Sequence, residues 1–397
     1  MRILYIVTKA EMGGVSVYLS QLSLYFKNKG NEVAVMAYPG GWLEDKIKEL
    51  GIKFYPNRYL KNSINPLLGF NTRKQLLRAI KDFNPDIIHC NSSIAGFWTR
   101  IIVKNSIPTI YTCHGWAFTD GALWWRRIIG ITTEKITSRY CSKIICTSEY
   151  DKNLALKYNI SEKQKLITIY NGIEIEPWDS ICQKRFEEKI KLEGTPYFKQ
   201  VRIVFVARLA MPKDPVTLIK AFKKLPENLK LESNIFIVGD GPDKESLEKL
   251  IKDLDLENKI HLLGSMDREE LKMIYISSDI NVLTTNYEAV PYTIKEAMSY
   301  GLPVIASDVG GCREAVDYNC GFLVKRGDVD GVKNALAKLI ISKELREKMG
   351  KAGYEKARGQ FALATMLQAT EAVYKDVLGQ KCPILRQAQD KLSDDRP

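Results

Sequence analysis

Short apolar runs alternate with helical patterns twice along this chain, and one polar stretch separates the two series. Such an alternation predicts parallel sheets that are covered by helices. In the first series the strand-like runs are 3–7, 32–36, 87–89, 108–112, 143–147 and 166–169, and helical patterns such as 15–26 and 72–81 lie between them.

The second series begins after residues 174–199, which are polar, contain Pro177, Gly194 and Pro196, and are predicted to be a linker. Its strand-like runs are 201–206, 234–238, 260–263 and 280–284, and its helical patterns are 216–225, 244–254 and 269–277. The predicted fold class is therefore α/β, with two Rossmann-like, doubly wound parallel-sheet domains facing a cleft. Ligands of such sheets bind at the carboxyl ends of the strands, so functional residues are expected there.

The length of 397 residues suits two or three domains, and no run of about 18 apolar residues is present to span a membrane. The apolar run at residues 1–7 is too short for a signal peptide and is predicted to be a strand. The eight cysteines form no C-x-x-C pair, which indicates reduced, mostly buried thiols in a cytosolic protein. With only three histidines, a histidine-based metal site is not expected.

The net charge of +12 comes from the first part of the chain. Residues 1–170 hold 24 Lys and Arg against 12 Asp and Glu, and the remaining residues are balanced. This asymmetry indicates a negatively charged partner such as an anionic membrane surface, a lipid phosphate or a nucleic acid.

An aromatic segment lies in the same basic part of the chain. Trp124, Trp125, Ile128 and Ile129 share one helical face, and Arg126 and Arg127 lie beside it. This pattern suits an interfacial helix on an anionic membrane, and a buried core helix explains the same spacing. Together with the charge asymmetry, it leads us to favour membrane contact.

Two glutamates, Glu288 and Glu296, flank a predicted helix start. Pro291 suits the first turn, residues 293–300 are predicted to be helical, and Gly301 ends the helix. A helix N-terminus has free N–H groups and partial positive charge, so it can hold a phosphate between the two carboxylates.

Cations and glycines follow other predicted strands. Arg208 and Lys213 come after the run 201–206 and can neutralise a diphosphate, although two solvated surface cations would look the same. Gly239 and Gly241 form a turn that either contacts a ligand or only reverses the chain. Gly264, Ser265 and Met266 follow the run 260–263, and Gly13 and Gly14 follow the first run.

His114 follows the predicted strand at 108–112, where it is either a site residue or a structural histidine, and we interpret His89 as structural support.

In their order and spacing, these motifs resemble those of the retaining glycosyltransferases of family 4, which have the GT-B architecture. The resemblance covers roughly residues 1–378, and Ala207 stands where the family often has Gly. It implies that Glu288 lies beside the donor sugar, that Glu296 holds the ribose, that Arg208 and Lys213 bind the diphosphate, and that His114 contacts the transferred sugar. The implied catalytic residues are Glu288, His114, Arg208 and Lys213, and the implied donor-binding residues are Gly13, Gly14, Gly239, Gly264, Ser265, Met266, Ala289, Val290, Pro291, Tyr292, Thr293 and Glu296.

The resemblance also implies a division of the chain. Residues 1–173 form the acceptor-side domain together with a crossover helix at about 362–378. Residues 174–199 are the linker, and residues 200–361 form the nucleotide-sugar domain. The tail at 379–397 is predicted to be disordered because it has no apolar periodicity.

The implied activity is transfer of a sugar from a nucleoside-diphosphate sugar to an acceptor hydroxyl, with retention of configuration and without a metal or other cofactor. The basic, aromatic first domain favours a lipid-linked glycan as acceptor in capsule, exopolysaccharide or lipopolysaccharide synthesis. No nucleic-acid partner is expected, and the expected location is the cytoplasm, at the inner face of the plasma membrane. The alternatives are a GT-B sugar-nucleotide epimerase and a non-catalytic sugar-nucleotide-binding module.

Overall fold

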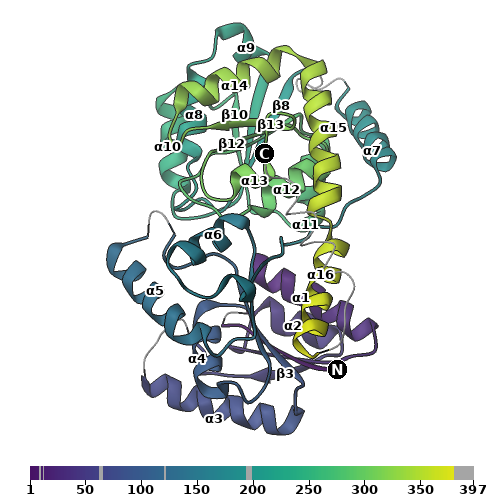
Figure 1. The fold of residues 1–397 in the computed structure, drawn as a ribbon. Coiled ribbons are helices and arrows are strands. Elements are labelled where there is room, and N and C mark those ends of the chain that lie inside the picture. The colour runs from purple at the N-terminus through teal and green to yellow at the C-terminus, as the bar shows by residue number, and fades with distance from the viewer. Residues whose placement is uncertain (9, 12, 62–65, 120–121, 194–198, 380–397) are drawn as a thin grey trace, which may run out of the picture. The chain divides into compact units, whose positions relative to one another are not determined.

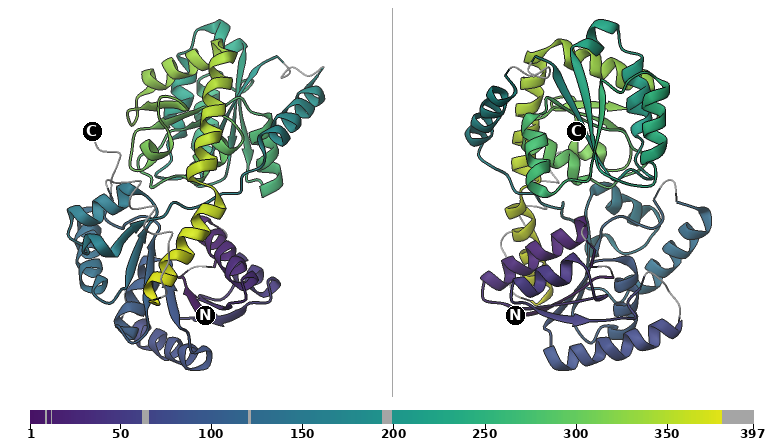
Figure 2. Two further views of the ribbon diagram at one scale, coloured as in Figure 1. Left: turned by 45° about the vertical axis from the view of Figure 1, so that its right-hand side comes forward. Right: turned by 180° about the vertical axis from the view of Figure 1, so that it is seen from behind.

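A computed structural model describes residues 1–8, 10–11, 13–61, 66–119, 122–193 and 199–379. The chain divides into two compact units (Figure 1). Unit 1 comprises Met1–Gly172 together with the chain from Leu363 onward, and unit 2 comprises Ile173–Ala362. Each unit contains one parallel sheet with helices packed on it, as the two further views also show (Figure 2), so the predicted α/β fold class is confirmed.

Unit 1 has a seven-stranded sheet in the order β3-β2-β1-β4-β5-β6-β7. Its strands are β1 (Arg2–Ile6), β2 (Glu32–Ala37), β3 (Lys53–Pro56), β4 (Ile87–Cys90), β5 (Thr109–Cys113), β6 (Lys143–Cys146) and β7 (Leu166–Thr168). Its helices are α1 (Gly14–Asn28), α2 (Trp42–Glu49), α3 (Pro66–Phe83), α4 (Ser93–Val103), α5 (Trp124–Ser138), α6 (Glu149–Lys157), the 3-10 helix η1 (Lys163–Lys165) and α16 (Leu363–Val377).

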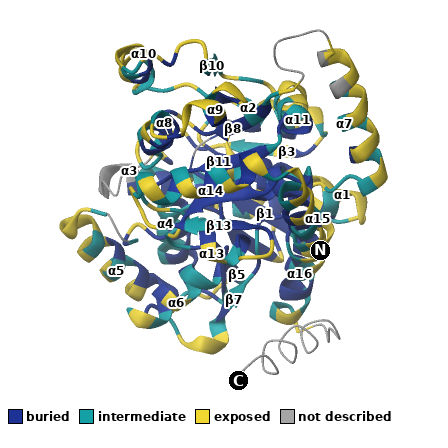
Figure 3. Cartoon of the chain, turned by 90° about the horizontal axis from the view of Figure 1, so that it is seen from above, coloured by how far each residue is buried: buried dark blue, intermediate teal, exposed yellow. Residues whose placement is uncertain are grey.

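Both faces of this sheet are covered, which explains why its strands are nearly continuous apolar runs. Successive residues of β1 point to opposite faces, so Leu4 and Ile6 belong to one core and Ile3 and Tyr5 to the other. Helices α3, α4 and α6 contribute to the first core, and α1, α2 and α16 contribute to the second. Figure 3 shows the central strands of the two units as buried.

Helix α16 completes the second core of unit 1 although it is separated from the rest of that unit by all of unit 2. The Tyr374 ring stacks on Phe26 with centroids 4.9 Å apart. The Tyr374 hydroxyl is 2.5 Å from Nδ1 of His89, and Nε2 of His89 is 2.6 Å from Oγ1 of Thr112. Burial lowers the pKa of His89 to about 3, so this histidine is neutral and serves as a fully buried structural residue.

Unit 2 has a six-stranded parallel sheet in the order β10-β9-β8-β11-β12-β13. Its strands are β8 (Val201–Val206), β9 (Ser233–Val238), β10 (Ile260–Gly264), β11 (Ile280–Leu283), β12 (Val304–Ser307) and β13 (Gly321–Val324). Its helices are α7 (Trp178–Leu192), α8 (Pro215–Lys223), α9 (Glu227–Leu231), α10 (Lys244–Asp253), α11 (Arg268–Ser277), α12 (Tyr292–Ser299), α13 (Cys312–Ala315), α14 (Val329–Ile341) and α15 (Lys343–Gln360).

Helix α7 lies within the stretch for which the sequence predicts a linker. Its residues pack on unit 2, because the Trp178 ring lies 4.9 Å from that of Tyr354 and Arg185 donates hydrogen bonds to carbonyl oxygens of Ser278 and Tyr300. Residues 194–198 of that stretch and residues 380–397 of the predicted disordered tail lie outside the described part of the chain.

Within the described residues, no helix is both long enough and apolar enough to cross a bilayer. The cysteines that the structure describes are buried, except for Cys182 on α7.

Candidate functional site

The loops that follow β8 and β11 are joined by backbone hydrogen bonds at the carboxyl ends of the strands. The N–H of Asp214 donates to the carbonyl of Thr284 over 3.0 Å, and the N–H of Asn286 donates to the carbonyl of Pro212 over 2.8 Å. Lys213 and Thr285 form an isolated antiparallel bridge between these contacts. The loop with the predicted cations is therefore fixed beside the loop with Glu288.

The two predicted cations have different environments. Nζ of Lys213 forms an ion pair with Oε1 of Glu288, and both side chains are mostly buried. Oγ1 of Thr285 lies 3.4 Å from the same carboxylate oxygen. Arg208 is exposed, and no ion pair of Arg208 is found with any described residue. The site therefore has one cation that is held by a carboxylate and one that points into solvent.

Gly239 and Gly241 lie directly against the loop that carries Arg208. A Cβ atom on Gly239 would lie 1.8 Å from the carbonyl oxygen of Ala207, and one on Gly241 would lie 2.2 Å from that of Leu209. Both glycines have positive φ, at 133° and 159°. The close packing of the two loops explains these glycines without any ligand.

Gly310 lies directly against the backbone of Glu288. Its φ is 51°, and a Cβ atom there would lie 1.8 Å from the carbonyl oxygen of Glu288. The N–H of Gly311 donates to that carbonyl over 3.2 Å. The loop after β12 therefore fixes the backbone of Glu288, a role that the sequence pattern did not reveal because the two segments are distant in the chain.

The helix that follows Glu288 begins one residue earlier than the sequence predicts. Helix α12 starts at Tyr292, and Pro291 is its N-cap residue, outside the first turn. The first helical N–H groups have no partner within the helix, and no acidic residue lies in the first turn. Oγ1 of Thr293 is a buried atom for which no described residue supplies a hydrogen bond. The start of α12 therefore presents the buried Thr293 hydroxyl together with the positive end of the helix dipole.

Glu296 lies further along α12 and is partly buried. The Tyr275 hydroxyl is 3.4 Å from its Oε2 and 3.4 Å from the carbonyl oxygen of Thr293. Burial raises the pKa of Glu296, and the charges of Arg268 and Lys295 oppose this shift. The carboxylate is therefore held close to the start of the helix by its place on α12 and by Tyr275.

Lys295 is a residue of this region that the sequence analysis missed. Its side chain is fully buried, with Nζ 4.1 Å from the centre of the Tyr292 ring. Burial lowers its pKa to about 7, and the neighbouring Glu296 opposes this shift. The available signal was its position among Ile294, Ala297 and Met298, which form the buried side of α12.

The remaining donor-site candidates of unit 2 lie in two loops. Gly264 ends β10 with a φ of 73°, and its carbonyl accepts a hydrogen bond of 2.8 Å from the N–H of Gly239. Ser265 and Met266 follow it before the start of α11. Ala289 and Val290 connect Glu288 to the start of α12, and the Val290 side chain is buried.

Unit 1 brings its own candidates together. His114 directly follows β5, and its ring lies edge-on to Tyr18 with centroids 4.9 Å apart. Tyr18 lies on α1, one turn after Gly14, and Gly13 is the N-cap residue of that helix. His114 is therefore beside the start of α1, at the carboxyl ends of the strands of unit 1.

The described residues contain no group of three or more His, Cys, Asp or Glu side chains that could hold a metal ion. The charged groups that follow the strands of unit 2 include Lys213, Arg208 and the two glutamates. This arrangement offers cations and helix N–H groups to an anion and carboxylates to hydroxyl groups.

Two protein families match the chain, one on each side of the boundary between the units. Residues 186–356 match the family described as glycosyl transferases group 1. Residues 12–177 match the family described as glycosyltransferase family 4. The two matches cover the sheet of unit 2 and all strands of the unit 1 sheet except β1, and the family resemblance is confirmed.

Curated relatives extend over most of the chain. The O-antigen biosynthesis glycosyltransferase WbnH of Escherichia coli is 28% identical over 330 residues, which cover 82% of this chain and 86% of that protein. The UDP-Gal:alpha-D-GlcNAc-diphosphoundecaprenol alpha-1,3-galactosyltransferase of Escherichia coli is 28% identical over 337 residues, which cover 81% of this chain and 85% of that protein.

Solved structures share the fold. The Anabaena protein Alr3699/HepE in complex with UDP has a TM-score of 0.79 at 19% identity and covers 95% of this chain and 100% of its own. Sucrose-phosphate synthase from Thermosynechococcus elongatus has a TM-score of 0.79 at 18% identity and covers 96% of this chain and 100% of its own. The predicted GT-B architecture is therefore confirmed.

Proposed function

From the chain's membership of the group 1 glycosyl transferases, with residues 12–177 matching glycosyltransferase family 4, we propose an enzyme that transfers a sugar. The sugar passes from a nucleoside diphosphate to an acceptor hydroxyl with retention of configuration. The observation that carries the donor assignment is the start of α12. The positive end of its dipole, the buried hydroxyl of Thr293 and the neighbouring cations suit a diphosphate.

In this proposal, Arg208, Lys213 and the start of α12 hold the diphosphate and stabilise the charge that develops on it. Lys213 exchanges part of its ion pair with Glu288 for the phosphate oxygens, which leaves the Glu288 carboxylate available beside the sugar. Glu296 accepts hydrogen bonds from the ribose hydroxyls, since its carboxylate lies on the same helix as the phosphate site. These cations supply the charge stabilisation, so we propose that the enzyme needs no metal.

The proposed bond changes balance without a further reactant. The bond between the anomeric carbon and the diphosphate oxygen breaks, and the electron pair stays on the diphosphate. The acceptor hydroxyl oxygen bonds to the anomeric carbon on the same face, and its proton passes to the departing phosphate oxygen. His114 and Glu288 orient the sugar and stabilise its cationic transition state.

We propose that the acceptor is a lipid-linked glycan and that the enzyme works at the cytoplasmic face of a membrane in polysaccharide synthesis. The names of the Escherichia coli relatives support this class, since one acts in O-antigen biosynthesis and another on a diphosphoundecaprenol-linked sugar. Residues Gly264, Ser265 and Met266 are the proposed contacts of the nucleobase, and Gly13 and Gly14 are the proposed contacts in unit 1.

A panel of UDP-, GDP- and ADP-sugars tests the proposal. We expect one donor to be consumed with transfer to a diphosphoprenol-linked acceptor, and NMR of the product to show the anomeric configuration of the donor. Arg208→Ala should lower the transfer rate at least about tenfold, because a charge-assisted hydrogen bond contributes about 1.5–3 kcal/mol. An unchanged rate in this variant would refute the diphosphate assignment.

The same panel separates the two alternatives. A sugar-nucleotide epimerase would convert the donor to its epimer without any acceptor. A non-catalytic binding module would bind a nucleotide sugar and leave it intact.

A further inference from the structure

Helix α5 exposes most of its large apolar side chains, and the residues that it buries are small or polar. The residues of α5 that are buried in unit 1 are Gly130, Glu134, Thr137 and Ser138. Most of the large apolar side chains on the helix and at its N-cap are exposed, with Trp124 exposed to 72%, and Ile131 alone among them packs against the core of unit 1. These exposed residues are Leu123, Trp124, Trp125, Ile128, Ile129 and Ile136. An amphipathic helix on a globular core has the opposite arrangement, with its apolar face inward.

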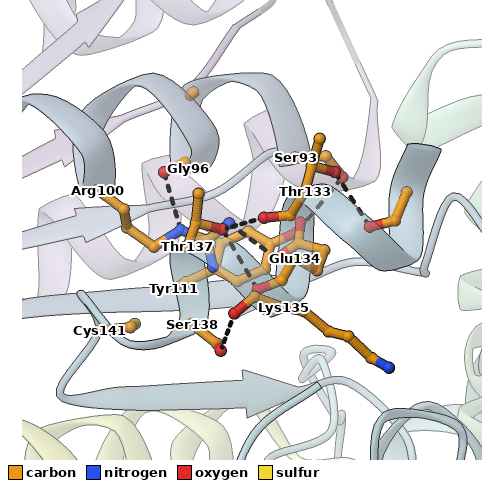
Figure 4. A network of polar contacts seen from close by, with 12 residues as sticks. Ser93, Gly96, Arg100, Tyr111, Thr133, Glu134, Lys135, Thr137, Ser138 and Cys141 are labelled. Atoms are coloured by element: carbon orange, nitrogen blue, oxygen red, sulfur yellow. Dashed lines mark hydrogen bonds and ion pairs between the residues drawn. The ribbon is translucent and has the colours of Figure 1, made fainter. Parts of the chain in front are cut away.

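A buried ion pair fixes this orientation (Figure 4). Nη2 of Arg100 on α4 lies 2.8 Å from Oε2 of Glu134, and Nε of Arg100 donates to the carbonyl of Gly96 over 2.9 Å. The guanidinium also lies over the Tyr111 ring at 4.3 Å from its centre. Arg100 is fully buried, so turning α5 to bury its indoles would leave the Arg100 charge without its carboxylate.

Close packing at Gly130, one turn before Glu134, also fixes the orientation of α5. A Cβ atom on Gly130 would lie 3.3 Å from atoms of both Ala117 and Phe118, so this part of the helix lies directly on the chain beneath it. A larger side chain would push α5 away. Specific contacts therefore keep small and polar residues on the inward face of α5, and most of its apolar side chains are left exposed.

The surroundings of this apolar face are basic. Arg126, Lys135 and Arg139 are exposed on or next to α5, and its only acidic residue is the buried Glu134. Helix α4 packs against both α5 and α3 within unit 1 (Figure 1). Helix α3 adds the exposed apolar residues Phe70 and Leu77 and the exposed cations Arg73, Lys74, Arg78 and Lys81.

We infer that the outward face of α5, with the exposed cations Arg126, Lys135 and Arg139 on or next to it, docks on an anionic lipid bilayer. Indole and aliphatic side chains enter the interfacial region of a bilayer, and the arginine and lysine side chains reach the phosphate groups around them. A second copy of the chain would bring cations against cations, and a nucleic acid would leave the aliphatic side chains in water. This inference rests on α5 and its neighbours and needs no assumption about the donor or acceptor.

Vesicle flotation of the full chain tests the inference. Vesicles of phosphatidylcholine with phosphatidylglycerol should bind the wild-type protein, and vesicles of phosphatidylcholine alone should bind it far more weakly. The double variant Trp124→Ser with Ile128→Ser should lose at least about tenfold of the partition coefficient, because two exposed apolar anchors are removed. Both side chains are exposed, and circular dichroism verifies that the variant is folded.

The matched control is Leu231→Ser with Ile341→Ser, which changes two exposed apolar residues of unit 2 and should leave binding unchanged. Equal binding by the Trp124/Ile128 variant and the wild type would overturn the inference, as would absence of wild-type binding to anionic vesicles. A wild-type dimer in size-exclusion chromatography that the Trp124/Ile128 variant converts to a monomer would assign the face to a second copy instead. Donor hydrolysis is measured in parallel, so a failure of vesicle binding is distinguishable from a failure of the proposed activity.

Discussion

Lys213 and Glu288 form an ion pair that joins the loop after β8 to the loop before α12. The cation proposed for the diphosphate is thus already neutralised by the carboxylate proposed for the sugar. Binding of a diphosphate must compete with Glu288 for Lys213, and any release of Glu288 coincides with arrival of the donor. In the proposed function, the pair therefore couples occupation of the phosphate site to the position of the Glu288 carboxylate.

Replacing Glu288 by Gln should separate binding from catalysis. Without the negative charge, Lys213 is free for the phosphates, so the Kd for the nucleoside diphosphate should fall severalfold. The kcat should fall at least about tenfold, since charge-assisted contacts in the transition state contribute about 1.5–3 kcal/mol. Calorimetry with the diphosphate and initial-rate kinetics measure the two effects.

Lys213→Met should weaken binding of the diphosphate, and Lys230→Met provides the control. Lys230 pairs with Glu227 on α9, which directly precedes β9 at its amino end, so its replacement should change neither the Kd for the diphosphate nor the kcat. Weaker diphosphate binding by the Glu288→Gln variant would contradict the competition between the carboxylate and the phosphates.

Donor affinity should depend on pH through Glu296. Burial raises its pKa above the usual value of 4.5, so in the free protein this carboxylate takes up a proton at a higher pH than an exposed glutamate does. A protonated carboxyl group accepts hydrogen bonds from the ribose hydroxyls less well than a carboxylate does. The affinity for the nucleotide should therefore fall as the pH is lowered, starting above pH 4.5. Calorimetric titrations of the nucleotide between pH 8 and pH 5 measure the profile.

Glu296→Gln should bind the nucleotide weakly and with a flatter pH profile. Glu269→Gln, on the exposed surface of α11, should keep the wild-type profile. Identical profiles for wild type and Glu296→Gln would show that another group titrates.

The buried Lys295 should make stability depend on pH. Burial lowers its pKa from the usual 10.5 to about 7, so between these values the unfolded state binds more protons than the folded state. The free energy of unfolding therefore rises with pH across this interval, by roughly 1.4 kcal/mol for each unit of pKa difference at most. Lys295→Met removes the group and should be more stable than the wild type at pH 7.

This advantage of Lys295→Met should shrink as the pH approaches 10. Urea unfolding of both proteins at pH 7, 8.5 and 10 gives the difference, which cancels the contributions of all other titrating groups. A difference that is constant across this range would mean that the charge of Lys295 is compensated in the folded protein.

Alanine substitutions should distinguish two glycines in adjacent loops. Gly239→Ala places a methyl group 1.8 Å from the carbonyl oxygen of Ala207, and it should lower the free energy of unfolding by at least about 2 kcal/mol. At Gly264 nothing lies within 4 Å of an added Cβ atom, so only the positive φ opposes the change, at about 1 kcal/mol. Urea denaturation measures both, and equal losses would contradict the packing argument.

Removing one hydroxyl should weaken the core of unit 1. Tyr374→Phe leaves Nδ1 of His89 without its partner, which should cost about 1–3 kcal/mol because the ring is fully buried. The Tyr5 hydroxyl lies 3.3 Å from that of Tyr374, and the Tyr5 ring lies 5.7 Å from the His89 ring. Tyr5→Phe keeps the ring and the hydrogen bond of His89, so it should cost less. Thermal denaturation compares the two, and a larger loss in Tyr5→Phe would argue against the role of His89.

Local patterns in the sequence were sufficient for most strands. β8 begins and ends where the apolar run at 201–206 predicts, and β1, β2 and β9 lie within one residue of their predicted bounds. Short elements with few apolar residues, such as β3 and α2, were missed, since their stability comes from packing on neighbours. Helix α7 was missed because its residues are mostly polar and its contacts, such as Arg185 with Ser278, are distant in the chain.

In the site, too, contacts between segments that are distant in the chain could not be predicted from the sequence. Spacing identified the loops and the cations, because strand ends and helix starts are local features. It did not reveal that Lys213 pairs with Glu288, that Gly310 fits against the Glu288 backbone, or that Lys295 is buried. For α5, periodicity identified the apolar face, but only the contact of Glu134 with Arg100, which lies on another helix, decides that this face points outward.

The place of α16 in the fold determines the order in which the protein is completed on the ribosome. Unit 2 is one continuous stretch of chain, so it has all its residues before α16 is synthesised. Most of unit 1 is made first, but its fold is completed last. Tyr374, which stacks on Phe26 and hydrogen-bonds to His89, is still untranslated at that stage. The first domain made is usually the first to fold. Here unit 2 can finish folding before unit 1, because unit 1 needs α16. A nascent chain of this protein carries an unfinished, basic first unit until α16 leaves the exit tunnel.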